Sequence, residues 1–251
     1  LVTVAFIVAI TGAIALQAAK KKGEPAWHRL LEGRALVFTV FAAIAVLVGG
    51  IAELVPSLAI KPAEIASKTD VRPYQPLELE GRDVYIREGC YTCHSQMIRS
   101  MRFESARYGD VSTMADSMYD HPFQWGSKRT GPDLARVGNR YSDEWHRAHL
   151  VDPRSVVPES VMPPYAFLER RDLDMSHMDA HLSANRLLRV PYTDEQLANA
   201  NADARAQAEP LASNAYDFEQ RYPGAAIRDF DGQPDRVTEM DALIAYLQML
   251  G

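Results

Sequence analysis

The chain has 251 residues, of which 47% are hydrophobic, 9% aromatic and 24% charged, and its formal net charge is −6. This composition excludes a disordered, collagen-like or low-complexity protein and predicts one or two domains. Residues 20–34 carry a net charge of +3, which leaves −9 for the rest of the chain. Nucleic acid is therefore not expected as a partner, because phosphate backbones are bound by clustered lysines and arginines. A basic protein partner fits better.

Residues 1–19 are apolar and contain no charged side chain. About 20 helical residues cross the hydrocarbon core of a bilayer, so this segment predicts a transmembrane helix. A secretory signal peptide would carry its positive charges before the apolar run, whereas residues 20–22, all lysines, follow it. The alternative is a buried helix of a soluble domain, but the segment is apolar on every face. The chain has no initiating methionine, which suggests an incomplete or processed start.

Residues 35–60 predict a second transmembrane helix, with Glu53 as their only charged residue before Lys61. The positive-inside rule places the short basic loop between the two helices in the cytoplasm. Everything after Ile60 is then expected on the outer face, which is the periplasm in a bacterium. Glu53 lies near that face, where its carboxylate either reaches the interface or contacts a partner subunit.

The fold class predicted for the whole chain is mostly α, a two-helix anchor over residues 1–60 followed by one globular domain. Prolines at four positions between residues 56 and 76 predict an extended tether over 61–76 and a domain over 77–251. Strand signals are nearly absent. Loops are expected over 109–128 and 152–164, and a charged insertion over 169–191. Helix signals occur over residues 77–88 and at the N-cap residues Ser142, Thr193 and Thr238.

Both cysteines lie in the sequence Cys90-Tyr91-Thr92-Cys93-His94, which has the C-x-x-C-H spacing of c-type haem attachment. Two thiols one helical turn apart can bond the two vinyl groups of one porphyrin edge, and the next residue puts an imidazole under the iron. A structural zinc site would need further cysteines or paired histidines. A thioredoxin-like redox pair would need a βαβ context. The motif therefore predicts one covalently attached haem c, with His94 as the proximal iron ligand and no disulfide.

The sixth iron ligand is predicted to be Met162, because it follows a proline-containing loop that can present a thioether without a helix blocking the iron. A His/Met pair also raises the potential of an electron-transfer cytochrome. Met97 and Met101 are too close to His94 in the chain to reach the opposite face easily, and other methionines are expected to fill the core. Five other histidines are expected at the surface or in hydrogen bonds: His121, His146, His149, His177 and His181.

The order of these features resembles that of class I cytochromes c: C-x-x-C-H, then Thr-Gly-Pro-Asp-Leu at 130–134, then Met-Pro at 162–163, then a terminal helix with LIAYLQ. The resemblance implies that the carbonyl of Pro132 accepts a hydrogen bond from the proximal histidine and fixes its ring. It also implies that Arg140 meets a haem propionate. The alternative for Arg140 is a solvated loop cation.

A closer resemblance is to the mono-haem cytochrome c subunit (subunit II) of cbb3-type cytochrome c oxidases. It is carried by GRDVYIREGCYTCHSQMIR at 81–99 and by the run from YDHPFQW to VMPPY at 119–165. The similarity covers residues 29–168 and the C-terminal helix. That family usually has one N-terminal anchor, so the segment 1–19 is extra.

This resemblance implies an electron relay within an enzyme of the bacterial inner membrane. The haem would receive electrons from donor cytochromes c and pass them to haem b of a catalytic haem-copper subunit, beside a di-haem cytochrome c subunit. A six-coordinate His/Met iron has no open position, so oxygen reduction and proton pumping would occur in the catalytic subunit. The alternatives are the cytochrome c subunit of a nitric oxide reductase and a free membrane-anchored shuttle. A copper-bearing oxidase subunit II would need two more cysteines. The segments 101–119 and 169–191 are either partner contacts or surface loops.

Overall fold

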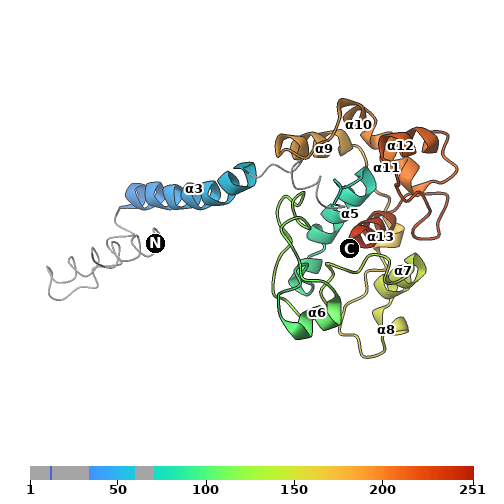
Figure 1. The fold of residues 1–251 in the computed structure, drawn as a ribbon, viewed down its shortest axis with the longest axis horizontal. Helices are drawn as coiled ribbons and strands as arrows, with labels where there is room; N and C mark the ends of the chain where they lie inside the picture. Colours follow the sequence, from blue (N-terminus) through green and yellow to red (C-terminus); the bar gives the residue numbers. More distant parts are fainter. Residues whose placement is uncertain (1–11, 13–33, 60–70) are drawn as a thin grey trace. The chain divides into compact units, whose positions relative to one another are not determined.

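A computed structural model describes residue 12, residues 34–59 and residues 71–251 (Figure 1). The chain divides into two compact units, Leu1–Ile60 and Lys61–Gly251. The cysteine motif, Pro132, Arg140 and Met162 all belong to the second unit.

The first unit contains the helix α3, Ala35–Ala59, in which residues 35–52 have a mean hydropathy of 2.6. Its described side chains are exposed, and none of the 35–52 window is buried. A helix of this length and composition can cross a bilayer. It is the one candidate membrane span within the described residues. The helix predicted over 1–19 lies outside them except for Gly12, so the two-helix anchor stays a prediction.

The second unit is helical, and no strand occurs in residues 71–251. The mostly α fold class is thus confirmed for this part of the chain. Its α-helices are α5 Pro76–Arg87, α6 Arg102–Tyr108, α7 Asp143–Val151, α8 Pro153–Val156, α9 Met178–Leu187, α10 Asp194–Ala198, α11 Ala200–Ala208, α12 Ala215–Arg221 and α13 Glu239–Met249. Two 3₁₀ turns join them, η1 Cys90–Thr92 and η2 Leu168–Arg170. In Figure 1, α9 to α12 gather at one end of the α5–α13 pair, and α6, α7 and α8 at the other.

The centre of the unit is the crossing of α5 and α13. Gly81 lies at this crossing, where a Cβ atom would overlap the backbone carbonyl of Ala242 and lie 2.8 Å from Cβ of Tyr246. Only glycine lets the two backbones approach so closely. Fully buried side chains from both helices surround it, among them Leu77, Tyr85, Met240, Ile244 and Tyr246. The crossing therefore fixes the helix that leads directly into the cysteine motif.

The helix starts predicted from capping residues are confirmed. Ser142 Oγ accepts from Trp145 N at 3.2 Å at the start of α7. Thr193 Oγ1 accepts from Gln196 N at 3.2 Å at the start of α10. Thr238 Oγ1 accepts from Met240 N and Asp241 N at the start of α13. In each case a side-chain oxygen pairs a helix N–H that has no partner within the helix.

The charged insertion predicted over 169–191 is not a plain surface loop. It overlaps η2 and contains the helix α9, and Met178 and Leu182 on α9 are fully buried. These two residues are four apart, so they share the face of α9 that packs against the core. Their stripe is only two residues long and lies among charged neighbours, which is why the sequence did not reveal it.

The packed domain also begins earlier than Leu77. Tyr74 and Gln75 are buried, and the Tyr74 hydroxyl donates to Asp120 Oδ1 at 2.7 Å. Arg82 Nε on α5 donates to the same carboxylate oxygen at 3.0 Å. This pair of contacts ties the irregular segment 109–128 to α5. The proline pattern of the tether carried no sign of these long-range contacts.

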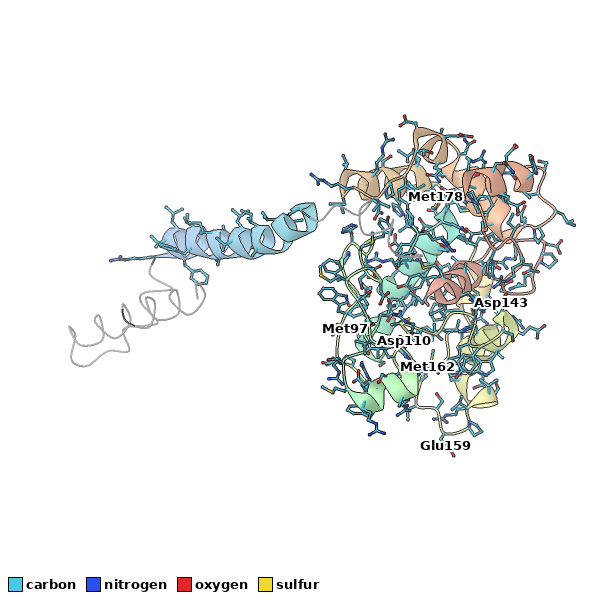
Figure 2. The ribbon with its side chains drawn as sticks, in the orientation of Figure 1. Met97, Asp110, Asp143, Glu159, Met162 and Met178 are labelled. Atoms are coloured by element: carbon cyan, nitrogen blue, oxygen red, sulfur yellow. The ribbon has the colours of Figure 1, made fainter. Side chains whose placement is uncertain are left out.

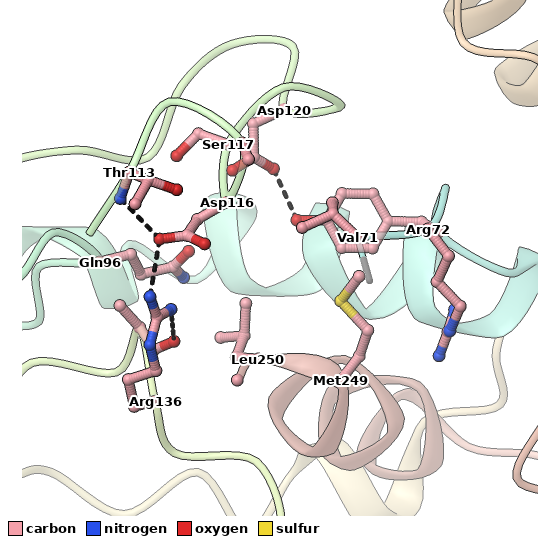
Figure 3. Close-up of a pocket in the computed structure, with 14 residues that line it drawn as sticks. Val71, Arg72, Gln96, Thr113, Asp116, Ser117, Asp120, Arg136, Met249 and Leu250 are labelled. Carbon is pink, nitrogen blue, oxygen red and sulfur yellow. Dashed lines mark hydrogen bonds and ion pairs between the residues drawn. The ribbon is translucent and has the colours of Figure 1, made fainter. Parts of the chain in front are cut away.

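A cavity of about 400 Å³ lies between this irregular segment and the C-terminus (Figure 3). Asp116 at its wall accepts from the backbone N–H of Thr113 at 2.8 Å and from Arg136 Nη2 at 2.7 Å. Its polar groups are thus largely paired with one another. None of the candidate site residues lines this cavity, so it is separate from the cysteine motif.

Candidate functional site

The cysteine motif stands at the end of α5. Gly89 adopts φ 73°, a left-handed conformation that ends the helix, and the turn η1 follows at once. The backbone N–H groups of Cys93 and His94 both donate to the carbonyl of Cys90, at 3.2 and 2.9 Å. Cys90 and Cys93 are half-buried free thiols. Burial raises the pKa of the Cys90 thiol to about 11, and nearby Glu88 adds to this effect. The turn thus presents two free thiols one helical turn apart.

The imidazole of His94 is oriented by a backbone carbonyl. Its Nδ1 lies 2.8 Å from the carbonyl oxygen of Pro132. A carbonyl can only accept, so Nδ1 carries the proton and Nε2 keeps a free lone pair. Burial lowers the pKa of His94, against the opposing effect of the Pro132 carbonyl. The neutral ring with a free Nε2 is the form that binds a metal ion.

The turn that carries Pro132 lies against the His94 ring. Gly131 N donates to the carbonyl of Cys93 at 3.0 Å. A Cβ atom at Gly131 would overlap atoms of the His94 ring. Glycine is therefore required at this position for the turn to approach the ring. The motif and the turn are thus assembled into one rigid unit from segments 38 residues apart.

A buried network of charges supports this unit from behind. The Glu104 side chain on α6 is fully buried, and its carboxylate is paired with Arg99 and with Arg129 Nη2 at 2.9 Å. Asp133, also fully buried, accepts from Ser95 Oγ at 2.8 Å and from Met97 N at 3.0 Å. These contacts connect the residues after His94, helix α6 and the segment 129–133. Loss of one partner would leave uncompensated buried charge.

We expect Glu104→Gln to destabilise the globular unit by about 3 kcal/mol at neutral pH, because it leaves two arginines without their buried carboxylate. Hydrogen bonds from Arg99, and then from Arg129, lower the pKa of Glu104 to about 2 from its ordinary 4.5. A depressed carboxyl pKa stabilises the fold above the ordinary value, and this contribution disappears as the pH falls from about 4.5 to 2. The unfolding free energy of the variant should therefore fall less steeply than that of the wild type across this interval.

Denaturant unfolding followed by circular dichroism at several pH values measures both effects. Glu219→Gln, at an exposed position of α12, is the matched control and should behave as the wild type. Equal pH slopes for Glu104→Gln and the wild type would contradict the role of this network.

Met162 lies in the loop that follows α8. It is half-buried and packs against the main core, as Cys90 does. Its backbone N–H donates to Ser160 Oγ at 3.2 Å. Tyr165 N donates to the carbonyl of Leu150 at 2.7 Å, so the loop returns to the end of α7. Figure 2 shows Met162 beside α7 and α8, away from Met97.

Comparison with models of protein families shows which family the chain belongs to. A family model described as Cytochrome C oxidase, mono-heme subunit/FixO matches residues 28–251. The chain belongs to this family. The resemblance to the mono-haem oxidase subunit is thereby confirmed, and the chain is a component of an oxidoreductase complex that carries one haem in this subunit. Among curated proteins, no match is found.

The residues of this mono-haem subunit fit a c-type haem. The half-buried thiols of Cys90 and Cys93 are free and lie on one turn. Next to them, the Nδ1 of His94 is engaged by Pro132, so Nε2 would be the atom that binds an iron. Two thiols and an imidazole in this order are the donor set of covalent haem attachment.

Arg140 is at the surface of the mono-haem subunit. It is exposed, and its Nη2 donates a long hydrogen bond of 3.4 Å to the carbonyl of Arg107. This contact does not bring it to His94 or to Met162. The contact with a haem propionate therefore stays a prediction for Arg140.

Helix α7 has a buried histidine and a stacked aromatic face. His146 is 4% exposed, its Nε2 has no hydrogen-bond partner among the described residues, and burial lowers its pKa to about 4. His146 is therefore not at the surface, and a hydrogen bond of its Nε2 stays a prediction. The rings of Tyr141, Trp145 and His149 stack along the same helix, with centroids 3.9 and 4.8 Å apart. Aromatic residues spaced by four in YSDEWHRAH were the signal for this face.

Proposed function

We propose that this chain is the electron-transfer subunit of a cbb3-type oxidase, with one haem c attached through Cys90 and Cys93. His94 and Met162 are the proposed iron ligands. The observation that carries the proposal is the hydrogen bond from His94 Nδ1 to the Pro132 carbonyl, made within a C-x-x-C-H turn whose thiols are free. A histidine so oriented, directly after two such thiols, has the arrangement expected of an iron ligand in a c-type haem site.

The bound haem would supply a one-electron iron centre. The chain's residues then act by orientation and by solvation, because outer-sphere electron transfer needs no acid or base group. Pro132 holds the His94 ring in one tautomer, and Gly131 lets the turn reach it. The paired charges of Glu104, Arg99 and Arg129 keep the segment after His94 in place. A rigid site of this kind would limit how far the surrounding protein atoms must rearrange when the charge of the iron changes.

The proposed partners follow from the family and the anchor. Helix α3 would hold the chain in the inner membrane of a bacterium, with the cytochrome domain in the periplasm. Donor cytochromes c would deliver electrons, and the haem b of the haem-copper catalytic subunit would receive them, in a complex with a di-haem cytochrome c subunit. The chain itself would not reduce oxygen, because ligation by both His94 and Met162 would leave the iron no open position.

Purification in mild detergent, followed by haem extraction and metal analysis, tests this function. Haem c with co-purifying haem b, copper and oxygen uptake would support the oxidase role. Haem c with haem b and non-haem iron, but without copper, would indicate a nitric oxide reductase instead. Haem c alone would indicate a free shuttle.

We expect Met162→Ala to lower the midpoint potential of the haem and to slow turnover of the complex, because a thioether ligand raises the potential. The expected fall is on the order of 0.1 V, within the range of about 0.8 V that axial ligands span. Redox titration and the reduced-minus-oxidised spectrum measure the change. Met97→Ala is the matched control and should keep the wild-type potential. An unchanged spectrum and potential in Met162→Ala would exclude Met162 as the ligand.

A further inference from the structure

A buried ion pair lies beside the segment that follows His94. The guanidinium of Arg129 is 3.5 Å from the carboxylate of Asp133, and these side chains are 20% and 0% exposed. Asp133 Oδ2 also accepts from Ser95 Oγ at 2.8 Å and from Met97 N at 3.0 Å. Arg129 donates to the Ser95 hydroxyl and, at 3.2 Å, to the carbonyl of Met97. Both charges are therefore fixed against the residues directly after His94.

Both members of the pair are also connected to His94 itself. Arg129 and His94 form an isolated antiparallel β-bridge. Asp133 follows Pro132 in the chain, and the carbonyl oxygen of Pro132 lies 2.8 Å from His94 Nδ1. The residue that Asp133 binds on the other side, Ser95, comes directly after His94. Contacts on both sides of His94 thus hold the two charges close to it.

Charges in this position would act on a haem iron held by His94. Water and salt screen exposed charges, but they screen buried charges much less. Oxidation of a haem iron adds one positive charge to the site. A fixed anion nearby stabilises that charge, and a fixed cation destabilises it. Asp133 and Arg129 would therefore act on the iron in opposite directions.

We propose that the buried pair sets the midpoint potential of the bound haem through two opposing effects: the carboxylate of Asp133 lowers the potential, and the guanidinium of Arg129 raises it. The proposal rests on the proposed haem c function. Neither side chain is an iron ligand, and each acts through its charge. The two charges sum to zero, so the potential of the wild type reflects the difference between the two effects. Removal of either charge should shift the potential.

The test compares Asp133→Asn with Arg129→Gln in the full chain within its complex. Each substitution removes one charge and leaves an amide that can still form hydrogen bonds. We expect the potential to rise in Asp133→Asn and to fall in Arg129→Gln. Each shift should change the ratio of reduced to oxidised haem about tenfold, which is about 59 mV. The double variant should return towards the wild-type potential. In a redox titration followed by absorbance, the haem of this chain is the component that disappears when Cys90 and Cys93 are replaced by alanine.

The direction of the two shifts separates an effect of charge from a purely structural effect. Both substitutions should lower the free energy of unfolding, because each leaves a buried charge without its partner. A site that is merely loosened would shift both potentials in the same direction. Shifts in the same direction, or the wild-type potential in either variant, would overturn the proposal. If Asp133→Asn does not bind haem, Arg129→Lys replaces it and should keep the wild-type potential, because it keeps the charge. A shift as large as that of Arg129→Gln would then overturn the proposal.

Asp194→Asn and Arg186→Gln are the matched controls. These two side chains form an ion pair at the surface, in which Asp194 is 91% and Arg186 is 43% exposed. Each control removes the same kind of charge, but from a position that water screens, so both should leave the potential unchanged. Failure of the wild-type chain to contain haem c would refute the proposed function instead.

Discussion

Replacing both Cys90 and Cys93 with alanine is expected to abolish covalent haem in this chain. The turn η1 holds the two thiols one helical turn apart, with His94 directly after them, and the chain has no other cysteine that could substitute. A haem without thioether bonds is held only by its ligands and by packing. The variant should therefore show no haem-dependent peroxidase stain after denaturing electrophoresis, and no mass increase corresponding to a haem.

Tyr91→Phe is the matched control for this prediction. Tyr91 lies between the two cysteines in the same turn and is 46% exposed, so its hydroxyl should not affect attachment. The control should stain as the wild type does. Staining of the double-cysteine variant at the wild-type level would show that the haem is attached elsewhere or that the motif has another use. Single Cys93→Ala should already prevent normal attachment.

Gly81→Val is expected to destabilise the globular unit by roughly 3 kcal/mol or more, the upper range for overpacking a core. A Cβ at this position would overlap the carbonyl of Ala242 on α13, and a backbone atom in a helix cannot move aside as a flexible side chain can. The two central helices would have to separate. Since α5 leads directly into Cys90, the variant should also incorporate less haem. Denaturant unfolding followed by circular dichroism measures the loss.

Ala180→Val is the matched control for Gly81→Val, because Ala180 is exposed on helix α9. The free energy of unfolding of Ala180→Val should fall only by the difference in helix propensity between alanine and valine, about 0.7 kcal/mol or less. Equal stability of Gly81→Val and Ala180→Val would contradict the close crossing of α5 and α13.

The sequence predicted those features that short patterns determine. The caps Ser142, Thr193 and Thr238 and the apolar run of α3 are local signals, and the structure has the corresponding helices. Helix α9 was missed because its buried face consists of two residues only. The burial of Tyr74 was missed because it depends on Asp120, which is 46 residues away. No local pattern reports a contact of that range.

The candidate site also has features that the sequence predicted and features that it could not predict. The spacing of the cysteine motif was visible in the sequence, and the resemblance added the carbonyl of Pro132, which lies within hydrogen-bond distance of His94. The need for glycine at 131 could not be deduced, because it arises from the approach of a distant turn to the ring. The burial of His146 was equally hidden, because it depends on how several elements pack around helix α7.

The most direct test of the electron-relay role is the rate at which a reduced donor cytochrome c reduces haem b in the oxidised, anaerobic complex. Stopped-flow absorbance would compare complexes that contain the wild-type chain or the double-cysteine variant, matched for their content of haem b and copper. We expect rapid reduction of haem b with the wild-type chain and at least a tenfold slower reduction with the variant, equivalent to about 1.4 kcal/mol or more in the barrier. Equal rates in the two complexes would contradict the relay, because electrons would then reach haem b without the haem of this chain.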